Sequence, residues 1–184
     1  MKRLFTVLFV AGLALGLLSA GMQGDKEFSY TGVAKCKMCH SKDKTGNQYA
    51  IWQKDKHSKA YETLASEESK KIAKEKGIAD AQKAPECLKC HVTAYGVDAK
   101  LLDKKFKIED GVGCESCHGP GSGYYSNKVM KDIYAGKLDG ATVGLIEPDE
   151  KLCVTCHNAE SPTFKGFDYK KFSAQIAHPV KPLK

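Results

Sequence analysis

The chain has 184 residues, with 29 basic and 22 acidic side chains and a formal net charge of +7. This length suits one folded domain. The lysines are scattered among acidic residues instead of being clustered with aromatic side chains on one face, so we expect no nucleic-acid partner.

The chain begins with a basic tripeptide and an apolar run over residues 4–18, followed by small residues. This order is typical of a secretory signal peptide, and we predict cleavage after Ala20 or Gly21, with Gly24 as a further possibility. Residues 1–21 would then be removed, and residues 22–184 would form a single domain in the periplasm that is not an integral membrane protein. The alternative is an uncleaved membrane anchor, because the apolar run is long for a signal.

All eight cysteines of the chain belong to four copies of the motif C-x-x-C-H. The cysteine pairs, from first motif to fourth, are Cys36 and Cys39, Cys87 and Cys90, Cys114 and Cys117, and Cys153 and Cys156. Two thiols at this spacing can form thioether bonds to the vinyl groups of one haem, while the adjacent histidine takes one axial position on the iron. The motifs therefore predict four covalently attached haem c groups, with His40, His91, His118 and His157 as iron ligands.

Two other uses of paired cysteines explain the four motifs less well. A disulfide framework is common in secreted chains, but it does not require a histidine after every second cysteine. Zinc sites built from two C-x-x-C pairs draw four ligands from two motifs, and they too leave the repeated histidine unexplained.

The mature chain offers roughly 40 residues for each haem, about the size below which a chain rarely builds its own core. We therefore expect the haems themselves to form the core. The predicted fold is mainly α, with short helices and long loops wrapped around four haems and little β structure. The haem-free chain should be largely unfolded.

In chain order, apolar periodicity predicts a helix over residues 48–64, with His57 on the same side as Trp52 and Leu64. Ser66 can cap a second helix that runs to about Lys76 before Gly77 ends it. Residues 101–102 and 106–108 are predicted to form a short hairpin.

Three more elements are expected in the last third of the chain. They are a helix over residues 124–134, a turn started by Asp149 or Glu150 that carries the fourth motif, and a helix over residues 168–178 stopped by Pro179.

Axial ligands are scarce, because the chain has six histidines and the motifs use four. His57 and His178 remain as candidate second ligands, the alternatives being a solvent-facing side chain for His57 and a frayed terminal one for His178. Histidine can therefore complete at most two of the four irons. The other two need a methionine, another donor or an open position, and Met130 is the best-placed methionine, although it is as easily explained as a core residue.

Several features follow the order found in a known family. They are a first motif followed by Trp52 and His57, a second followed by Val92 and Gly96, the glycine-bounded third motif over residues 111–121, and a fourth motif with a late histidine. In these features the chain resembles the tetrahaem cytochrome c554 family, over nearly all of its mature length.

The resemblance implies a mostly helical fold with haems in stacked and perpendicular pairs. It makes His57 the second ligand of the third haem and His178 that of the fourth, and it leaves the second haem five-coordinate. In the family the first haem takes a histidine shortly after the Gly-Pro-Gly of the third motif. Residues 122–130 contain no histidine, so the ligand of the first haem is open.

The leading prediction is a periplasmic protein that transfers electrons one at a time through four closely packed haems, between a redox protein donor and acceptor. No nucleotide-binding glycine loop or Ser/His/Asp set offers another chemistry. An alternative is a small nitrogen-oxide reductase, acting for example on nitric oxide, at an open iron. A third alternative is a subunit of a complex in which a protein other than this chain supplies a missing iron ligand.

Overall fold

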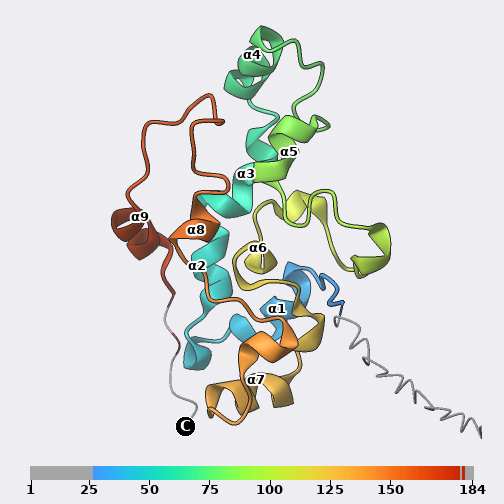
Figure 1. Cartoon of the computed structure of the whole chain (residues 1–184), viewed down its shortest axis with the longest axis vertical. Coiled ribbons are helices and arrows are strands. Elements are labelled where there is room, and N and C mark those ends of the chain that lie inside the picture. Colours follow the sequence, from blue (N-terminus) through green and yellow to red (C-terminus); the bar gives the residue numbers. More distant parts are fainter. Residues whose placement is uncertain (1–26, 179, 181–184) are drawn as a thin grey trace, which may run out of the picture.

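A computed structural model describes residues 27–178 and Val180, and the predicted signal peptide lies outside them. Short α-helices joined by turns and loops make up the described chain (Figure 1). In chain order they are α1 (Val33–His40), α2 (Gln48–Lys54), α3 (Ala60–Thr63), α4 (Glu67–Glu75), α5 (Pro85–His91), α6 (Cys114–His118), α7 (Asn127–Tyr134), α8 (Glu150–Cys153) and α9 (Tyr169–Ile176).

Each cysteine motif lies on or directly after one of these helices. The first three motifs end α1, α5 and α6, and the fourth begins at the last residue of α8. Pro85 starts α5, where its missing N–H costs no helical hydrogen bond. Asp149 caps α8 as the sequence predicted, because its carboxylate accepts a hydrogen bond of 2.9 Å from the Leu152 amide.

The helix predicted over residues 48–64 is broken, so that prediction is wrong in its middle. α2 ends at Lys54, Asp55 is extended with ψ 157°, and a 3-10 helix over Lys56–Lys59 leads into α3. The Asp55 carboxylate accepts a hydrogen bond from the His57 amide at 2.9 Å. A short acceptor side chain that binds the backbone two residues later competes with helix formation, and it changes the direction of the chain just before His57.

The other predicted helices are present, with shifted ends. Ser66 caps α4 by accepting a hydrogen bond from the Ser69 amide at 3.2 Å, and Gly77 follows the helix with φ 69°. α7 starts later than predicted, after its cap Ser126. Asp168 caps α9, which ends two residues before His178.

The hairpin expected around residues 101–108 does not form. The 3-10 helices Ala99–Leu101 and Ile108–Asp110 overlap the ends of its two halves. Instead, Tyr30 binds this segment from a distant part of the chain, donating to the Leu101 carbonyl at 2.7 Å and accepting from the Asp103 amide at 2.8 Å. Since Tyr30 occupies those backbone groups, they are not available to a local strand pair.

The hydrophobic core is small for a chain of this length. Its main cluster contains Leu64, Ala73, Ala81, Leu88 and Val92, and within the described residues no large side chain is completely buried. The fold is mainly α, as predicted, and the described part contains one isolated β-bridge and no sheet. In the same part, no helix has the length and apolar character needed to cross a bilayer.

The arrangement places α6, which carries the third motif, near the middle of the molecule (Figure 1). α4 and α5 lie toward one end and α1 and α7 toward the other, with α9 at one side. The third motif is therefore flanked by the segments that carry the other three.

Candidate haem sites

The eight cysteines come together in neighbouring motifs, and all eight are free thiols in this structure. The thiol of Cys36 in the first motif interacts with that of Cys114 in the third. This interaction is the largest cause that raises the pKa of Cys36 and lowers that of Cys114, while burial raises both. Burial and then the charge and hydrogen bond of Cys156 raise the pKa of Cys90. The first motif thus contacts the third, and the second contacts the fourth.

The third and fourth motifs also lie near each other. Burial is the main cause that raises the pKa of Cys117 to about 11, and the neighbouring thiol Cys153 is the next. A thiol with a raised pKa stays protonated and weakly nucleophilic at neutral pH. These four motifs therefore form one continuous group, which is the packing that close haem-to-haem spacing requires.

Four of the six histidines form two facing pairs. The rings of His57 and His157 have centroids 5.8 Å apart at 90°, and those of His118 and His178 have centroids 5.8 Å apart at 71°. Two ligand bonds of about 2 Å on opposite sides of one metal ion bring two imidazole centroids to roughly this separation. This separation would suit one iron between the two rings where both Nε2 atoms point at it.

These ring contacts differ from the ligand pairing that the family resemblance implies, and that pairing stays a prediction. His57 faces the histidine of the fourth motif, not that of the third, and His178 faces the histidine of the third motif, not that of the fourth. Two features of the fold produce these contacts: the bend at Asp55 redirects the chain before His57, and α9 places His178 beside the third motif. Ligation of iron by either residue stays a prediction.

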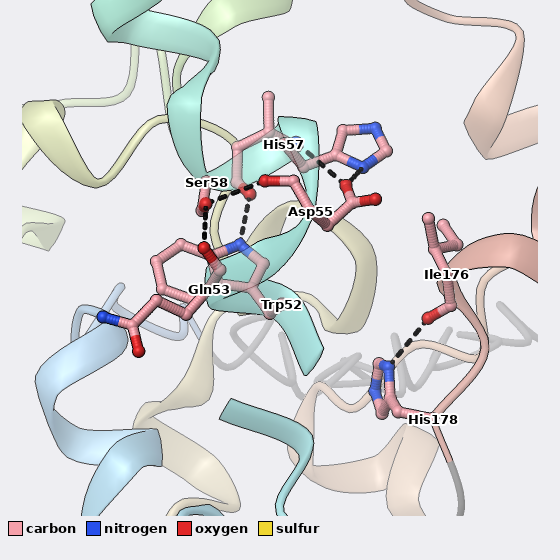
Figure 2. A network of polar contacts seen from close by, with 8 residues as sticks. Trp52, Gln53, Asp55, His57, Ser58, Ile176 and His178 are labelled. Carbon is pink, nitrogen blue, oxygen red and sulfur yellow. Dashed lines mark hydrogen bonds and ion pairs between the residues drawn. The ribbon is translucent and has the colours of Figure 1, made fainter. Parts of the chain in front are cut away.

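Five of the six histidines have an acceptor at Nδ1. The contacts are His40 to Gln48 Oε1 at 3.1 Å, His57 to Asp55 Oδ1 at 2.7 Å, His91 to the Ala60 carbonyl at 2.7 Å, His118 to the Ile146 carbonyl at 3.4 Å and His178 to the Ile176 carbonyl at 3.1 Å. Figure 2 shows those of His57 and His178. An acceptor at Nδ1 places the proton there and leaves Nε2 as the free electron pair for a metal.

His157 is oriented by an aromatic ring. Phe167 stacks on its imidazole at a centroid distance of 4.8 Å and an angle of 15°, and Phe172 stacks in turn on Phe167 at 5.5 Å. Packing of this kind restricts rotation of the imidazole. Phe167 therefore supports the ring that faces His57.

Two of the motif histidines have lowered pKa values. Burial is the main cause for His118 and for His157, and the facing histidine, His178 or His57, adds to the effect. Both causes disfavour the imidazolium. The neutral form that results is the one that binds a metal.

The segment that carries His57, a candidate second ligand, is hydrogen-bonded to backbone groups next to the third motif. The Trp52 indole donates to the Val112 carbonyl at 2.9 Å, and the Val112 amide donates to the His57 carbonyl at 3.0 Å. Gly111 makes this approach possible, because it has φ 67° and a Cβ there would lie 2.9 Å from the His57 carbonyl oxygen. Both the helix before His57, through Trp52, and the His57 carbonyl itself are thus hydrogen-bonded to Val112.

His40 and His91 have no histidine partner, since the two facing pairs use the other four. In the region where the resemblance implies a histidine, Tyr124 is buried and donates its hydroxyl hydrogen bond to the carbonyls of His118 at 2.9 Å and Gly119 at 2.7 Å. Its hydroxyl is therefore already engaged. Met130 is half-buried on α7, and its candidate role as a ligand stays a prediction.

Sequence reasoning missed the residues that orient the ligands. Asp55, Phe167 and Gln48 carry no motif, although an aspartate two residues before a candidate ligand histidine is a recognisable signal. It also missed Glu115, a buried acid inside the third motif. Within the described part, no cluster of three or more histidine, cysteine or acidic side chains could hold a metal ion by itself.

Comparisons with known proteins agree with these features. Residues 35–119 match the model of the family described as cytochrome c554 and c-prime. Cytochrome c-554 of Nitrosomonas europaea is 30% identical over 179 residues, covering 89% of this chain and 73% of that protein. No solved structure matches the chain.

Proposed function

This chain belongs to the cytochrome c554 family, and we propose that it is a periplasmic electron carrier that passes electrons one at a time through four haems. Membership makes it a c-type cytochrome with covalently bound haem. The number of haems, the relay between them and the location are our proposal. Four complete motifs support the number, and the predicted signal peptide supports the location.

The cysteines and motif histidines named above would hold the haems, and His57 and His178 would complete two of them. When bound, each haem supplies a one-electron couple of its iron. The chain has a different task, which is to fix the spacing of the four sites. The contacts of the first motif with the third and of the second with the fourth serve that task.

The single observation that supports this proposal most is the facing of His57 with His157 and of His178 with His118. Two imidazoles on one iron make a closed, six-coordinate site, which can change charge without binding a substrate. Closed sites favour electron transfer over catalysis at the same iron.

The test uses matured protein with all its haems. Spectroelectrochemical titration with small redox mediators should show fully reversible one-electron reduction, with about four electrons taken up per chain. Failure of a correctly matured sample to exchange electrons with the mediators would exclude a carrier role. Mass spectrometry of the same sample gives the number of haems.

A second candidate function is supported by His40 and His91, which have no histidine partner. An open iron at either position would bind a diatomic molecule, as a small nitric oxide reductase requires. Carbon monoxide or nitric oxide should then shift the spectrum of the reduced protein, and nitric oxide should be consumed faster than by free haem. Turnover no faster than free haem would leave the carrier role as the remaining function.

The partners that the proposal requires are a redox protein that donates electrons and another that accepts them. The chain carries no nucleotide-binding motif of its own that would couple it to a soluble hydride donor. Cross-linking in a periplasmic extract, followed by identification of haem proteins in the products, tests this part.

A further inference from the structure

A buried acid lies between the first and third motifs. Glu115 follows the first cysteine of the third motif, and only 4% of its surface is exposed. Burial of a carboxylate is costly unless its oxygens are satisfied by donors. Its surroundings therefore decide whether it can keep a charge.

Four donors surround the Glu115 carboxylate. Oε1 accepts hydrogen bonds from the amides of Thr31 and Gly121, both at 2.7 Å, and from the Thr31 hydroxyl at 3.2 Å, while Oε2 accepts from the Gly32 amide at 2.8 Å. Three of these donors are backbone N–H groups, which cannot accept a proton in return. Such a set gives both oxygens of a buried carboxylate hydrogen-bond donors.

No cation neutralises this charge within the described part of the chain, where none of the ion pairs includes Glu115. Gly121 provides the space, because a Cβ at this position would lie 2.8 Å from Oε1. The site is thus shaped around a bare carboxylate that is held by dipoles.

The carboxylate also bridges two motifs. Gly32 caps the start of α1, the helix that carries the first motif, and Glu115 itself lies in α6 with the third. Its field reaches both sides, because the charge of Glu115 is one of the causes that raise the pKa of Cys36 in the first motif, and it also acts to raise the pKa of Cys114 in the third, against the larger lowering effect of Cys36. The charge therefore acts on the attachment sites of two haems at once.

We propose that Glu115 is a fixed buried anion that positions the first and third motifs and lowers the reduction potentials of both their haems. This inference rests on the proposed function. Uptake of one electron adds one negative charge to a site, and a nearby anion in a low-dielectric interior opposes that uptake. No proton transfer is part of the step.

The test compares three variants in the full matured protein, with midpoint potentials measured by spectroelectrochemical titration and haem number by mass spectrometry. Glu115→Gln removes the charge, and two of the four potentials should shift to more positive values while the other two stay close to those of the unaltered protein. Glu86→Gln is the matched control. Glu86 is exposed and adjacent to Cys87, so water screens its charge and the shift should be smaller.

Thr31→Val provides a test that does not depend on removing the acid. It deletes one hydroxyl donor and keeps the carboxylate, so the anion is less compensated and the same two potentials should shift to more negative values. If Glu115 had a merely structural role, Glu115→Gln and Thr31→Val would instead shift the potentials in the same direction. The opposite signs are the signature of charge.

Unchanged potentials in Glu115→Gln, or shifts no larger than those in Glu86→Gln, would overturn the inference. If Glu115→Gln does not mature, Thr31→Val is the deciding variant. Potentials in Thr31→Val that are unchanged or more positive would then overturn the inference. The proposed function is tested separately by the unaltered protein. If the unaltered protein has four haems and is reduced reversibly, but Glu115→Gln leaves the potentials unchanged, this inference alone is disproved.

Discussion

At the scale of single residues, the chemistry depends on six imidazoles and the groups that orient them. Backbone carbonyls hold His91, His118 and His178, and the Asp55 carboxylate holds His57. A charged acceptor raises the electron density on the ring more than a neutral carbonyl does. Of the two candidate second ligands, His57 therefore has the stronger orienting partner.

The pairing of His57 can be tested by combining substitutions. Replacing Cys153 and Cys156 with alanine removes the fourth haem site, and in that background His57→Ala should cause no further loss of low-spin haem signal, because its iron is already gone. His178→Ala is the control and should still remove one such signal. A further loss caused by His57→Ala would assign it to another haem. Electron paramagnetic resonance of the oxidised protein measures both.

Asp55 should act as a positioning residue for His57. Asp55→Ala deletes the acceptor of the His57 ring, and loss of such a partner typically weakens metal ligation by about 10- to 100-fold. We expect a fraction of one haem to become high-spin, which absorption spectroscopy detects. Asp98→Ala is a matched control, because Asp98 also accepts from an amide two residues later, at 3.0 Å, and orients no histidine. Equal spectra for the two variants would contradict the role of Asp55.

At the scale of elements, the third motif joins the others through its flanking glycines. Thr93, two residues after the second motif, accepts from the Gly113 amide at 2.8 Å and donates to the Gly111 carbonyl at 3.0 Å. The Ile146 amide donates to the His118 carbonyl at 2.9 Å. Residues 111–121 thus connect the second motif, the His57 segment and the chain that leads to the fourth motif.

The close approach at Gly111 predicts a measurable loss of stability. Gly111→Ala puts a Cβ 2.9 Å from the His57 carbonyl oxygen, in addition to the strain of φ 67°, which alone costs roughly 1 to 3 kcal/mol. Gly136→Ala is the control, with φ 66° and no atom within 4 Å of the added Cβ. Thermal unfolding of the matured proteins should show the larger loss for Gly111→Ala. Equal losses in the two variants would mean that backbone strain explains the whole loss of stability and that the contact with His57 adds nothing.

The sequence predicts most of these elements and few of their contacts. Caps such as Ser66 and Asp149 act locally, so they could be predicted from neighbouring residues. The break at Asp55 was missed because apolar periodicity continues through it. The hairpin was wrong because Tyr30, about 70 residues away, binds the backbone of that segment. Likewise the histidines were found by counting, whereas their pairing depends on how distant segments pack.

At the scale of the whole molecule, the protein has little core of its own. The buried apolar residues are few and include several alanines, and aromatic side chains such as Tyr95 and Phe172 are exposed. Stability from apolar burial scales with the area removed from water. We therefore propose that most of that area comes from the haems.

The haem-free chain should therefore be largely unfolded. Expression without the cytochrome c maturation system gives the chain with free thiols, and far-ultraviolet circular dichroism with thermal or denaturant unfolding measures its state. We expect low helicity and no cooperative transition, whereas the matured protein should unfold cooperatively. A cooperative, native-like transition in the haem-free chain would show that the polypeptide builds its own core.

The most direct test of the account is a count of axial ligand types in the matured protein by electron paramagnetic resonance and near-infrared magnetic circular dichroism. The account predicts four haems, of which two are bis-histidine, completed by His57 and His178, and two have another or no second ligand. Each of the two histidine variants should remove one bis-histidine signal. A protein with fewer than four haems, or with no bis-histidine haem, would contradict it.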